Sequence, residues 1–152
     1  MTTTRSNIRP FGPLLEAVKE YRKNEDHHVM NAARSLEEEI ITIQQDQMFA
    51  GRRADGQAIK PRYAPFTIAE KDRKGQPTDR VTLLDTGAFY EGMYVHFSRA
   101  LFETDSLDPK TAELMDKYRD IIFGLNRESL EYFINEFYRE ALQKEFRKSL
   151  FG

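Results

Sequence analysis

The stretch that decides the fold is Val81–Thr104, which reads VTLLDTGAFYEGMYVHFSRALFET. Apolar and polar side chains alternate over Met93–Phe97, and a second run of the same kind covers Ala100–Thr104. Alternation of this kind is typical of strands with one buried face. The two runs therefore predict an antiparallel hairpin that turns near Ser98-Arg99.

The segment before this hairpin carries a turn motif. Val81–Leu84 predicts a further short strand, which runs into Asp85, Thr86 and Gly87. Asp and Thr side chains can bond to the backbone two residues on, and glycine takes a positive φ without strain. We therefore expect Asp85, Thr86 and Gly87 to form a structural turn, from which Phe89 points back into the core.

Two helices are predicted upstream of the hairpin. The first runs from Pro13 to about Lys23, and Asn24 or Asp26 can cap a longer second helix. The apolar stripe of the second helix recurs every three or four residues and comprises Val29, Ala33, Leu36, Ile40 and Ile43. Gly51 is expected to end that helix.

Downstream, Thr111–Tyr118 predicts a helix, Ile121–Phe123 a short buried strand, and Asn126 the cap of a final helix. The apolar face of the final helix comprises Leu130, Phe133, Ile134, Phe137, Ala141 and Leu142. We therefore predict a single α+β domain over residues 1–152. Its N-terminal and C-terminal helices pack on a small antiparallel β-sheet, with a long basic loop between helix and sheet.

Composition excludes several classes of protein. The chain has 152 residues, a formal net charge of -2 and no cysteine. Disulfide scaffolds, thiolate nucleophiles, Cys-based zinc sites and iron–sulfur clusters are therefore excluded. Apolar runs are only a few residues long, and the N-terminal residues have no apolar core typical of a signal peptide. We expect a soluble protein that does not enter a membrane and is intracellular when made.

One segment, residues 51–80, differs in charge from the rest of the chain. It holds eight basic and four acidic side chains, a net of +4, whereas the remaining residues have a net of -6. Two aromatic residues, Tyr63 and Phe66, lie among the basic ones, which are Arg52, Arg53, Lys60, Arg62, Lys71, Arg73, Lys74 and Arg80. Such a segment can contact a phosphate backbone, the acidic surface of a neighbouring copy, or only solvent. Its Gly and Pro content predicts an irregular arm that is mobile in the free subunit, with one short helical turn that Thr67 can cap.

No motif for catalysis or cofactor binding is present. His27 and His28 are adjacent and point about 100° apart on a helix, so they cannot easily share a metal ion. His96 lies in a predicted strand. The chain has no HExxH, nucleophile-elbow or P-loop pattern. We therefore predict no catalytic, metal or cofactor-binding residue.

Three short motifs occur in a characteristic order. They are Pro61-Arg62-Tyr63-Ala64-Pro65-Phe66-Thr67 with Lys71, then Leu83-Leu84-Asp85-Thr86-Gly87-Ala88-Phe89, then Tyr118-Arg119-Asp120-Ile121-Ile122-Phe123-Gly124-Leu125. This series resembles the virion morphogenesis or tail-completion proteins of tailed bacteriophages. Those proteins show a Tyr/Trp-Ala/Ser-Pro-x-Thr...Lys motif and then Leu-x-Asp-Thr-Gly-x-Leu/Phe. The third motif departs from theirs at Arg119, where a glycine is common.

The resemblance implies a structural protein rather than an enzyme. Members of the family form rings, often sixfold, at the neck or the head-proximal end of the tail, and they have no catalytic residue or cofactor. The implied partners are other copies of the chain, other neck, connector or tail-tube proteins, and DNA that passes through the ring. The implied location is the virion, after assembly in the host cytoplasm. The basic arm would then be a subunit or lumen contact.

Two alternatives stay open. The first is a small nucleic-acid-binding module that uses residues 51–80. The second is a hydrolase that uses Asp85, because Asp-Thr-Gly also occurs in aspartic proteases. Such a protease needs two aspartates from two lobes or two subunits, in a β-rich chain, and the predicted helical ends disfavour that arrangement.

Overall fold

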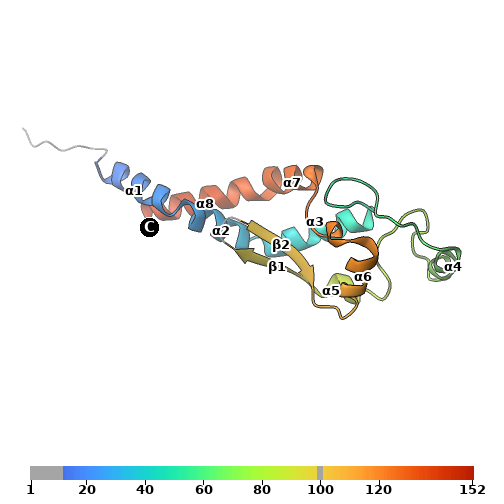
Figure 1. Ribbon diagram of the computed structural model, residues 1–152. Helices are drawn as coiled ribbons and strands as arrows, with labels where there is room; N and C mark the ends of the chain where they lie inside the picture. Colours follow the sequence, from blue (N-terminus) through green and yellow to red (C-terminus); the bar gives the residue numbers. More distant parts are fainter. Residues whose placement is uncertain (1–11, 99–100) are drawn as a thin grey trace, which may run out of the picture.

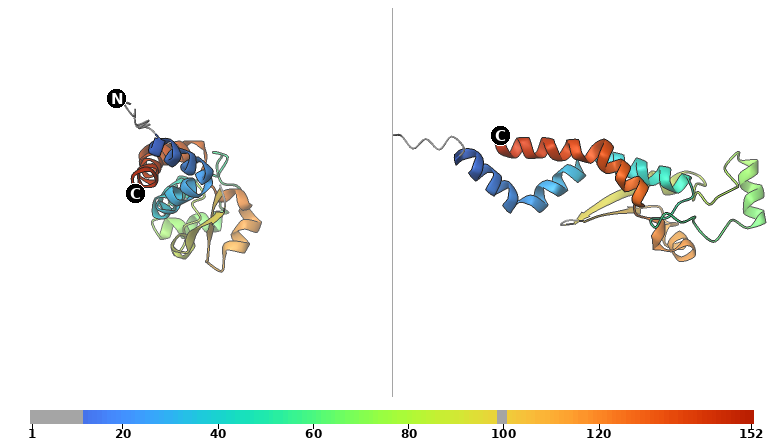
Figure 2. Two further views of the ribbon diagram at one scale, coloured as in Figure 1. Left: turned by 90° about the vertical axis from the view of Figure 1, so that its left-hand side faces the viewer. Right: turned by 90° about the horizontal axis from the view of Figure 1, so that it is seen from above.

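The computed structural model describes residues 12–98 and 101–152 as an elongated molecule (Figure 1). Helices α1 (Gly12–Lys23) and α8 (Arg139–Phe151) form one end, and α4 (Pro65–Arg73) lies at the opposite end. The second view from above shows the same elongation (Figure 2). Within these described ranges, no helix is long and apolar enough to cross a membrane.

The predicted long second helix is in fact two helices, α2 (Glu25–Arg34) and α3 (Glu37–Phe49). Leu36 leaves the helical conformation with φ −115° and ψ 24°, and the Ser35 hydroxyl donates to the carbonyl of Ala32 at 2.7 Å. A serine that bonds to the backbone in this way competes with helix continuation. Gly51 follows α3 with φ +73°, as predicted for the end of this segment.

The predicted cap of the second helix is only partly right. Asn24 precedes α2, but its side chain accepts no cap bond from that helix. The Asn24 amide instead donates to the carbonyl and the carboxylate of Glu20, each at 3.1 Å. Asn24 therefore closes α1 rather than opening α2.

The last helical segment consists of three parts. These are α7 (Arg127–Phe133), a π-helical turn over Ile134–Tyr138, and α8. The predicted cap is confirmed, because the Asn126 side chain accepts from the Ser129 nitrogen at 2.9 Å. Phe133 is buried as predicted, whereas Leu130 is 38% exposed, so its place on the buried face was wrong.

The hairpin is confirmed as a two-stranded antiparallel sheet, and so is the α+β class. Strands β1 (Met93–Ser98) and β2 (Leu101–Ser106) pair with Met93 opposite Ser106 and Val95 opposite Thr104. These four side chains are all buried. They therefore form the inner face of the sheet, and α3 contacts β1. Of the predicted turn, Arg99 lies outside the described residues.

Both other predicted strands are wrong. Val81–Leu84 pairs with no strand. The Thr82 and Leu83 nitrogens donate to the Tyr63 hydroxyl, and Leu83 takes a positive φ of 59°, which is not a strand conformation. Ile121–Phe123 overlaps a 3-10 turn, η1 (Asp120–Ile122), in which the Phe123 nitrogen donates to the Asp120 carbonyl at 3.0 Å. At this segment, a hydrogen bond between residues three apart takes the place of pairing with another strand.

Most of the buried apolar residues form two clusters. The smaller one comprises Ile40, Ile43, Val95 and Phe133 and joins α3, the sheet and α7. The larger one comprises Met48, Ile59, Val81, Leu83, Phe89, Met93, Tyr118 and Ile122. It lies among α3, α5 (Ala88–Glu91), α6 (Thr111–Tyr118) and the arm.

Residues 51–80 are less irregular than predicted. They contain the nine-residue helix α4, with Pro65 at its first position, where a missing N–H costs nothing. Ala64, and not Thr67, precedes that helix as its N-cap residue. Ile59 within the arm is buried in the larger cluster. This packing anchors the arm at Ile59, and the mobility of the arm in the free subunit stays a prediction.

Candidate interaction surface

The inner face of the arm, defined as residues 51–80, is anchored by Tyr63. The Tyr63 hydroxyl accepts hydrogen bonds from the backbone nitrogens of Thr82 at 2.9 Å and Leu83 at 3.2 Å. These are two buried residues whose N–H groups have no strand partner. Satisfying such donors is worth about 1 kcal/mol each. The Tyr63 hydroxyl therefore joins the arm to the rest of the molecule, which we call the body.

Lys71 belongs to the same anchor and not to the outer surface. It is only 7% exposed, and its ammonium donates to the Leu84 carbonyl and to the Gln76 side chain. The ammonium also lies 4.8 Å from the centre of the Tyr63 ring. A buried lysine needs such partners for its charge. The prediction that Lys71 contacts a neighbouring subunit or the lumen is therefore wrong for this conformation.

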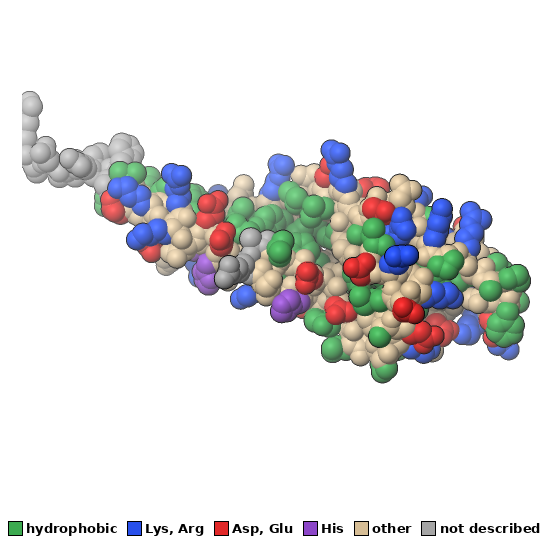
Figure 3. All heavy atoms as spheres, in the orientation of Figure 1, with side chains coloured by type: hydrophobic (Ala, Val, Ile, Leu, Met, Phe, Trp, Pro, Cys, Tyr) green, Lys and Arg blue, Asp and Glu red, His purple; other side chains and the backbone are tan. Residues whose placement is uncertain are grey.

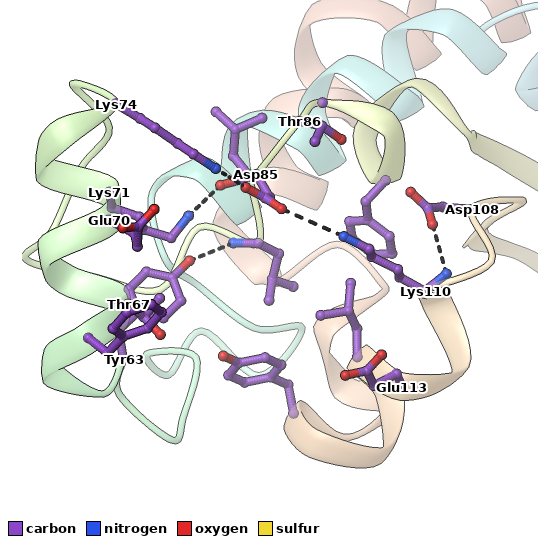
Figure 4. Close-up of a pocket in the computed structure, with 17 residues that line it drawn as sticks. Tyr63, Thr67, Glu70, Lys71, Lys74, Asp85, Thr86, Asp108, Lys110 and Glu113 are labelled. Carbon is purple, nitrogen blue, oxygen red and sulfur yellow. Dashed lines mark hydrogen bonds and ion pairs between the residues drawn. The ribbon is translucent and has the colours of Figure 1, made fainter.

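Asp85 joins three elements rather than tying its own turn. Its carboxylate lies 2.5 Å from the ammonium of Lys74, which directly follows α4, and 3.6 Å from the ammonium of Lys110, which directly precedes α6 (Figure 4). The hydrogen bond from Lys74 holds the pKa of Asp85 below its ordinary value, against a smaller effect of burial. The turn is held by Thr86, whose hydroxyl accepts from the Ala88 nitrogen at 3.3 Å, and by Gly87 at φ +96°. The predicted turn is confirmed, but the predicted role of the Asp85 side chain is not.

A hollow of about 390 Å³ lies between α4, the Leu83–Gly87 segment and α6. Leu83, Phe89 and Leu114 contribute apolar surface to it. Its charged lining is mixed and comprises Glu70, Lys71, Lys74, Asp85, Asp108, Lys110 and Glu113 (Figure 4). Within the described ranges, no group of three His, Cys, Asp or Glu side chains could hold a metal ion. The hollow is chiefly the joint between arm and body.

The sequence did not point to Asp108 and Lys110 in this joint. Asp108 accepts from the Lys110 nitrogen at 2.7 Å, which sets the first turn before α6. An Asp-Pro pair at residues 108–109 is a turn signal that could have located this bend. Nothing in the local pattern places Lys110 beside Asp85, which is 25 residues earlier.

Three cations of the arm have partners within the chain. Arg53 forms a two-point ion pair with Asp55 at 2.8 and 3.2 Å, and Arg73 pairs with Glu70 at 2.5 Å. Arg80 donates to the Phe49 carbonyl at 2.6 Å and to Asp79 at 2.8 Å. Together with Lys71 and Lys74, these side chains direct most of the arm's positive charge to partners inside the chain.

The remaining cations are Arg52, Lys60 and Arg62. All three are exposed, and over residues 12–98 and 101–152 none has a carboxylate within 4 Å. Lys60 and Arg62 belong to a short exposed run that leads into α4. We call this run the arm edge, and it comprises Lys60, Pro61, Arg62, Ala64, Pro65 and Phe66.

Phe66 is the outstanding apolar residue of the arm edge, with 77% of its surface exposed. In the space-filling view, hydrophobic side chains cluster at the end of the molecule where α4 lies, with Lys and Arg side chains beside them (Figure 3). An exposed aromatic residue that directly follows a proline and lies close in sequence to two exposed cations is suited to a contact with another macromolecule.

The chain was compared with protein-family models, with curated proteins and with solved structures, and none of the three comparisons found a match. The geometry of the arm and the motif series in the sequence are therefore the observations that bear on function.

Proposed function

We propose that this protein is a structural subunit of a tailed-bacteriophage virion, a tail-completion or neck protein that assembles as a ring at the head–tail junction. The order of the Tyr63–Pro65, Leu83–Phe89 and Tyr118–Leu125 motifs supports this proposal. The structure has the α+β fold that the sequence patterns predict, with helices packed on one small hairpin.

One observation carries the proposal: the arm edge is exposed, while other side chains of the same arm bind it to the rest of the molecule. Tyr63, Lys71 and Lys74 hold the inner face, and Phe66 is left 77% exposed. A contact surface that is already ordered loses little conformational entropy on binding. This favours repeated docking between folded subunits.

The overall shape supports a ring. The arm edge lies at one end of an elongated body (Figure 1), a position that suits a contact with a different patch on its neighbour. A head-to-tail contact between unlike patches generates a ring when its rotation closes. The opposite net charges of the arm and the rest of the chain, +4 and -6, suit such a contact.

The test is the mass of the purified protein in solution, measured by light scattering over a range of concentration and salt. We expect a discrete ring mass that falls as salt screens the charged contacts. A monomer at every concentration and salt would contradict spontaneous ring formation.

A second candidate is a nucleic-acid-binding module, favoured by the exposed Arg52, Lys60 and Arg62 beside the exposed Phe66. This candidate predicts DNA affinity that falls steeply with salt. Changing Arg52 and Arg62 to Gln should then lower the slope of log affinity against log salt by about one for each phosphate that the variant no longer neutralises. An unchanged slope would reject this role for the two arginines.

A further inference from the structure

We propose that the arm edge of one copy docks into an acidic seam between α3 and α7 of the next copy. This inference rests on the proposed ring-forming function and names the two surfaces that would build the ring. The arm edge is the set of exposed residues between Lys60 and Phe66 defined above, without Tyr63. The acidic seam is defined by two adjoining hollows along the flank of the molecule.

The two hollows have volumes of about 240 and 300 Å³ and share Ile43, Asp46 and Tyr132. They therefore form one continuous depression along the line where α3 packs on α7. The first also includes Glu38 and Glu39, and the second includes Glu128. The sequence alone predicts no more than a solvated helix face for the run Glu37–Glu39.

The charge of the seam is the reverse of that of the arm edge. Glu38, Glu39, Asp46 and Glu128 line it, against the single cation Arg52. In the described part of the chain, none of these four carboxylates has a cation within 4 Å. Lys60 and Arg62 on the arm edge likewise have no partner there. The fold thus leaves unpaired anions on one surface and unpaired cations on another.

The apolar parts of the two surfaces also match. Tyr132 in the seam is 53% exposed and packs edge-on against Phe137, with ring centres 5.9 Å apart. Ile43 lines the same two hollows and is only 6% exposed. An exposed aromatic ring held by a neighbour, beside a buried aliphatic residue, can receive a side chain such as Phe66. Aromatic anchors surrounded by charged rims are typical of the strongest parts of protein interfaces.

The two surfaces do not meet within one copy. No hydrogen bond or ion pair among residues 12–98 and 101–152 joins Lys60 or Arg62 to the seam. In the ribbon view, α4 is at the end of the molecule, whereas α3 and α7 run along its middle (Figure 1). The contact is therefore expected between copies, as a head-to-tail joint requires.

A second copy fits the seam better than nucleic acid does. Four unpaired carboxylates repel a phosphate backbone, so the seam cannot continue the basic surface of the arm edge onto DNA. The same carboxylates attract Lys60 and Arg62. Another copy of this chain therefore supplies a partner for both surfaces, the arm edge and the acidic seam.

The natural absence of cysteine allows a direct test. Phe66→Cys and Tyr132→Cys are made in separate full-length chains, which are mixed and mildly oxidised. We expect a disulfide-linked dimer containing one of each variant. Leu107→Cys replaces Tyr132→Cys as the matched control, since Leu107 is 76% exposed but lies outside the seam. Equal linkage with Leu107→Cys would show random collision and overturn the proposal.

Charge reversal provides a second readout that does not depend on disulfide geometry. Lys60→Glu with Arg62→Glu should weaken self-association at least about tenfold, and Glu38→Lys with Glu39→Lys should do the same. The four changes in one chain should restore association, because every joint then has its charges exchanged. The control for the seam pair is Glu103→Lys with Asp116→Lys, which makes the same change in net charge at exposed positions that line neither the seam nor the hollow beside the arm.

The results separate this inference from the proposed ring. A wild-type ring that survives both charge reversals and gives no specific disulfide would overturn the docking mode but leave the ring proposal intact. A wild-type protein that remains monomeric would overturn both. DNA binding that disappears in Lys60→Glu with Arg62→Glu, without specific disulfide formation, would identify nucleic acid as the occupant of the arm edge and overturn the inference.

Discussion

The side-chain oxygen of Gln44 lies 2.8 Å from the hydroxyl of Thr104, and this buried contact joins α3 to β2. The same oxygen accepts from the Gly124 nitrogen at 2.8 Å, and both Gln44 and Thr104 are buried. One amide therefore links a helix, a strand and the chain that leads into α7.

Gln44→Met is expected to lower the free energy of unfolding by about 1–3 kcal/mol, because it keeps the volume similar but removes the acceptor of the buried Thr104 hydroxyl and of the half-buried Gly124 nitrogen. Urea unfolding followed by circular dichroism measures this. Gln57→Met is the matched control, since Gln57 is exposed and its side chain makes no hydrogen bond in the described residues. Equal stability of the two variants would contradict the structural role of Gln44.

Tyr63→Phe is expected to loosen the arm, because it keeps the ring but removes the acceptor for the Thr82 and Leu83 nitrogens. The loss should be about 1–2 kcal/mol. Amide hydrogen exchange should accelerate at Thr82 and Leu83. The control is Tyr94→Phe, whose hydroxyl makes only a 3.4 Å contact with Asp105. Fast amide exchange at Thr82 and Leu83 in the unmodified protein would show that their hydrogen bonds to the Tyr63 hydroxyl do not protect them.

Gly92→Ala is expected to destabilise the connection between α5 and β1, because the added Cβ has too little space. A Cβ at this position would lie 2.8 Å from the Ser106 hydroxyl and 3.0 Å from the Asp108 nitrogen, although φ is an ordinary −78°. Overpacking of this kind costs about 1–3 kcal/mol. Gly75→Asn is the contrast, because Gly75 has φ +70° and open space, and Asn tolerates that conformation. Thermal unfolding of both variants should show the larger loss for Gly92→Ala.

The contact of Glu145 with α2 predicts a dependence of stability on pH. Its carboxylate accepts from the Asn31 amide and contacts the His28 ring, each at 3.2 Å. Burial of Glu145 acts to raise its pKa, but the hydrogen bonds from Asn31 and His28 outweigh burial and leave the pKa below the ordinary 4.5. A lowered folded-state pKa stabilises the protein above the unfolded value, and this stabilisation is lost as pH falls through the folded value.

Glu145→Gln should therefore flatten the fall in stability below about pH 4.5, where the ordinary carboxyl titrates. The measurement is the melting temperature from pH 7 to pH 3. Glu140→Gln removes an exposed carboxylate of the same helix and serves as the control. A Glu145→Gln curve parallel to that of the unmodified protein would reject this linkage.

The sequence predicted the hairpin well, because the alternation that defines each strand lies within a short window of residues. Alternation over Met93–Phe97 places Met93 and Val95 on one face, and both are buried. Val81–Leu84 has similar residues but forms no strand, because the Tyr63 hydroxyl, about twenty positions earlier, takes its N–H groups. No window of sequence contains that bond.

The site was predicted less completely for the same reason. Composition located the basic arm, but it could not show which cations are used internally. Lys71 is buried because the Leu84 carbonyl, 13 residues away, accepts from it. Lys60 and Arg62 stay unpaired only because no carboxylate of the described fold reaches them. These outcomes depend on tertiary placement and not on residue type.

The π-helical turn over Ile134–Tyr138 has a consequence for the register of the whole C-terminal segment. It adds one residue to a helical turn, and an α-helix advances about 100° per residue. The added residue puts α8 out of phase with α7, so α7 turns Phe133 toward the hairpin while α8 turns Glu145 toward α2. Deleting Asn135 alone would rotate α8 by about 100° and direct Glu145 away from His28. The spacing of residues, as much as their chemistry, selects which neighbours the last helix meets.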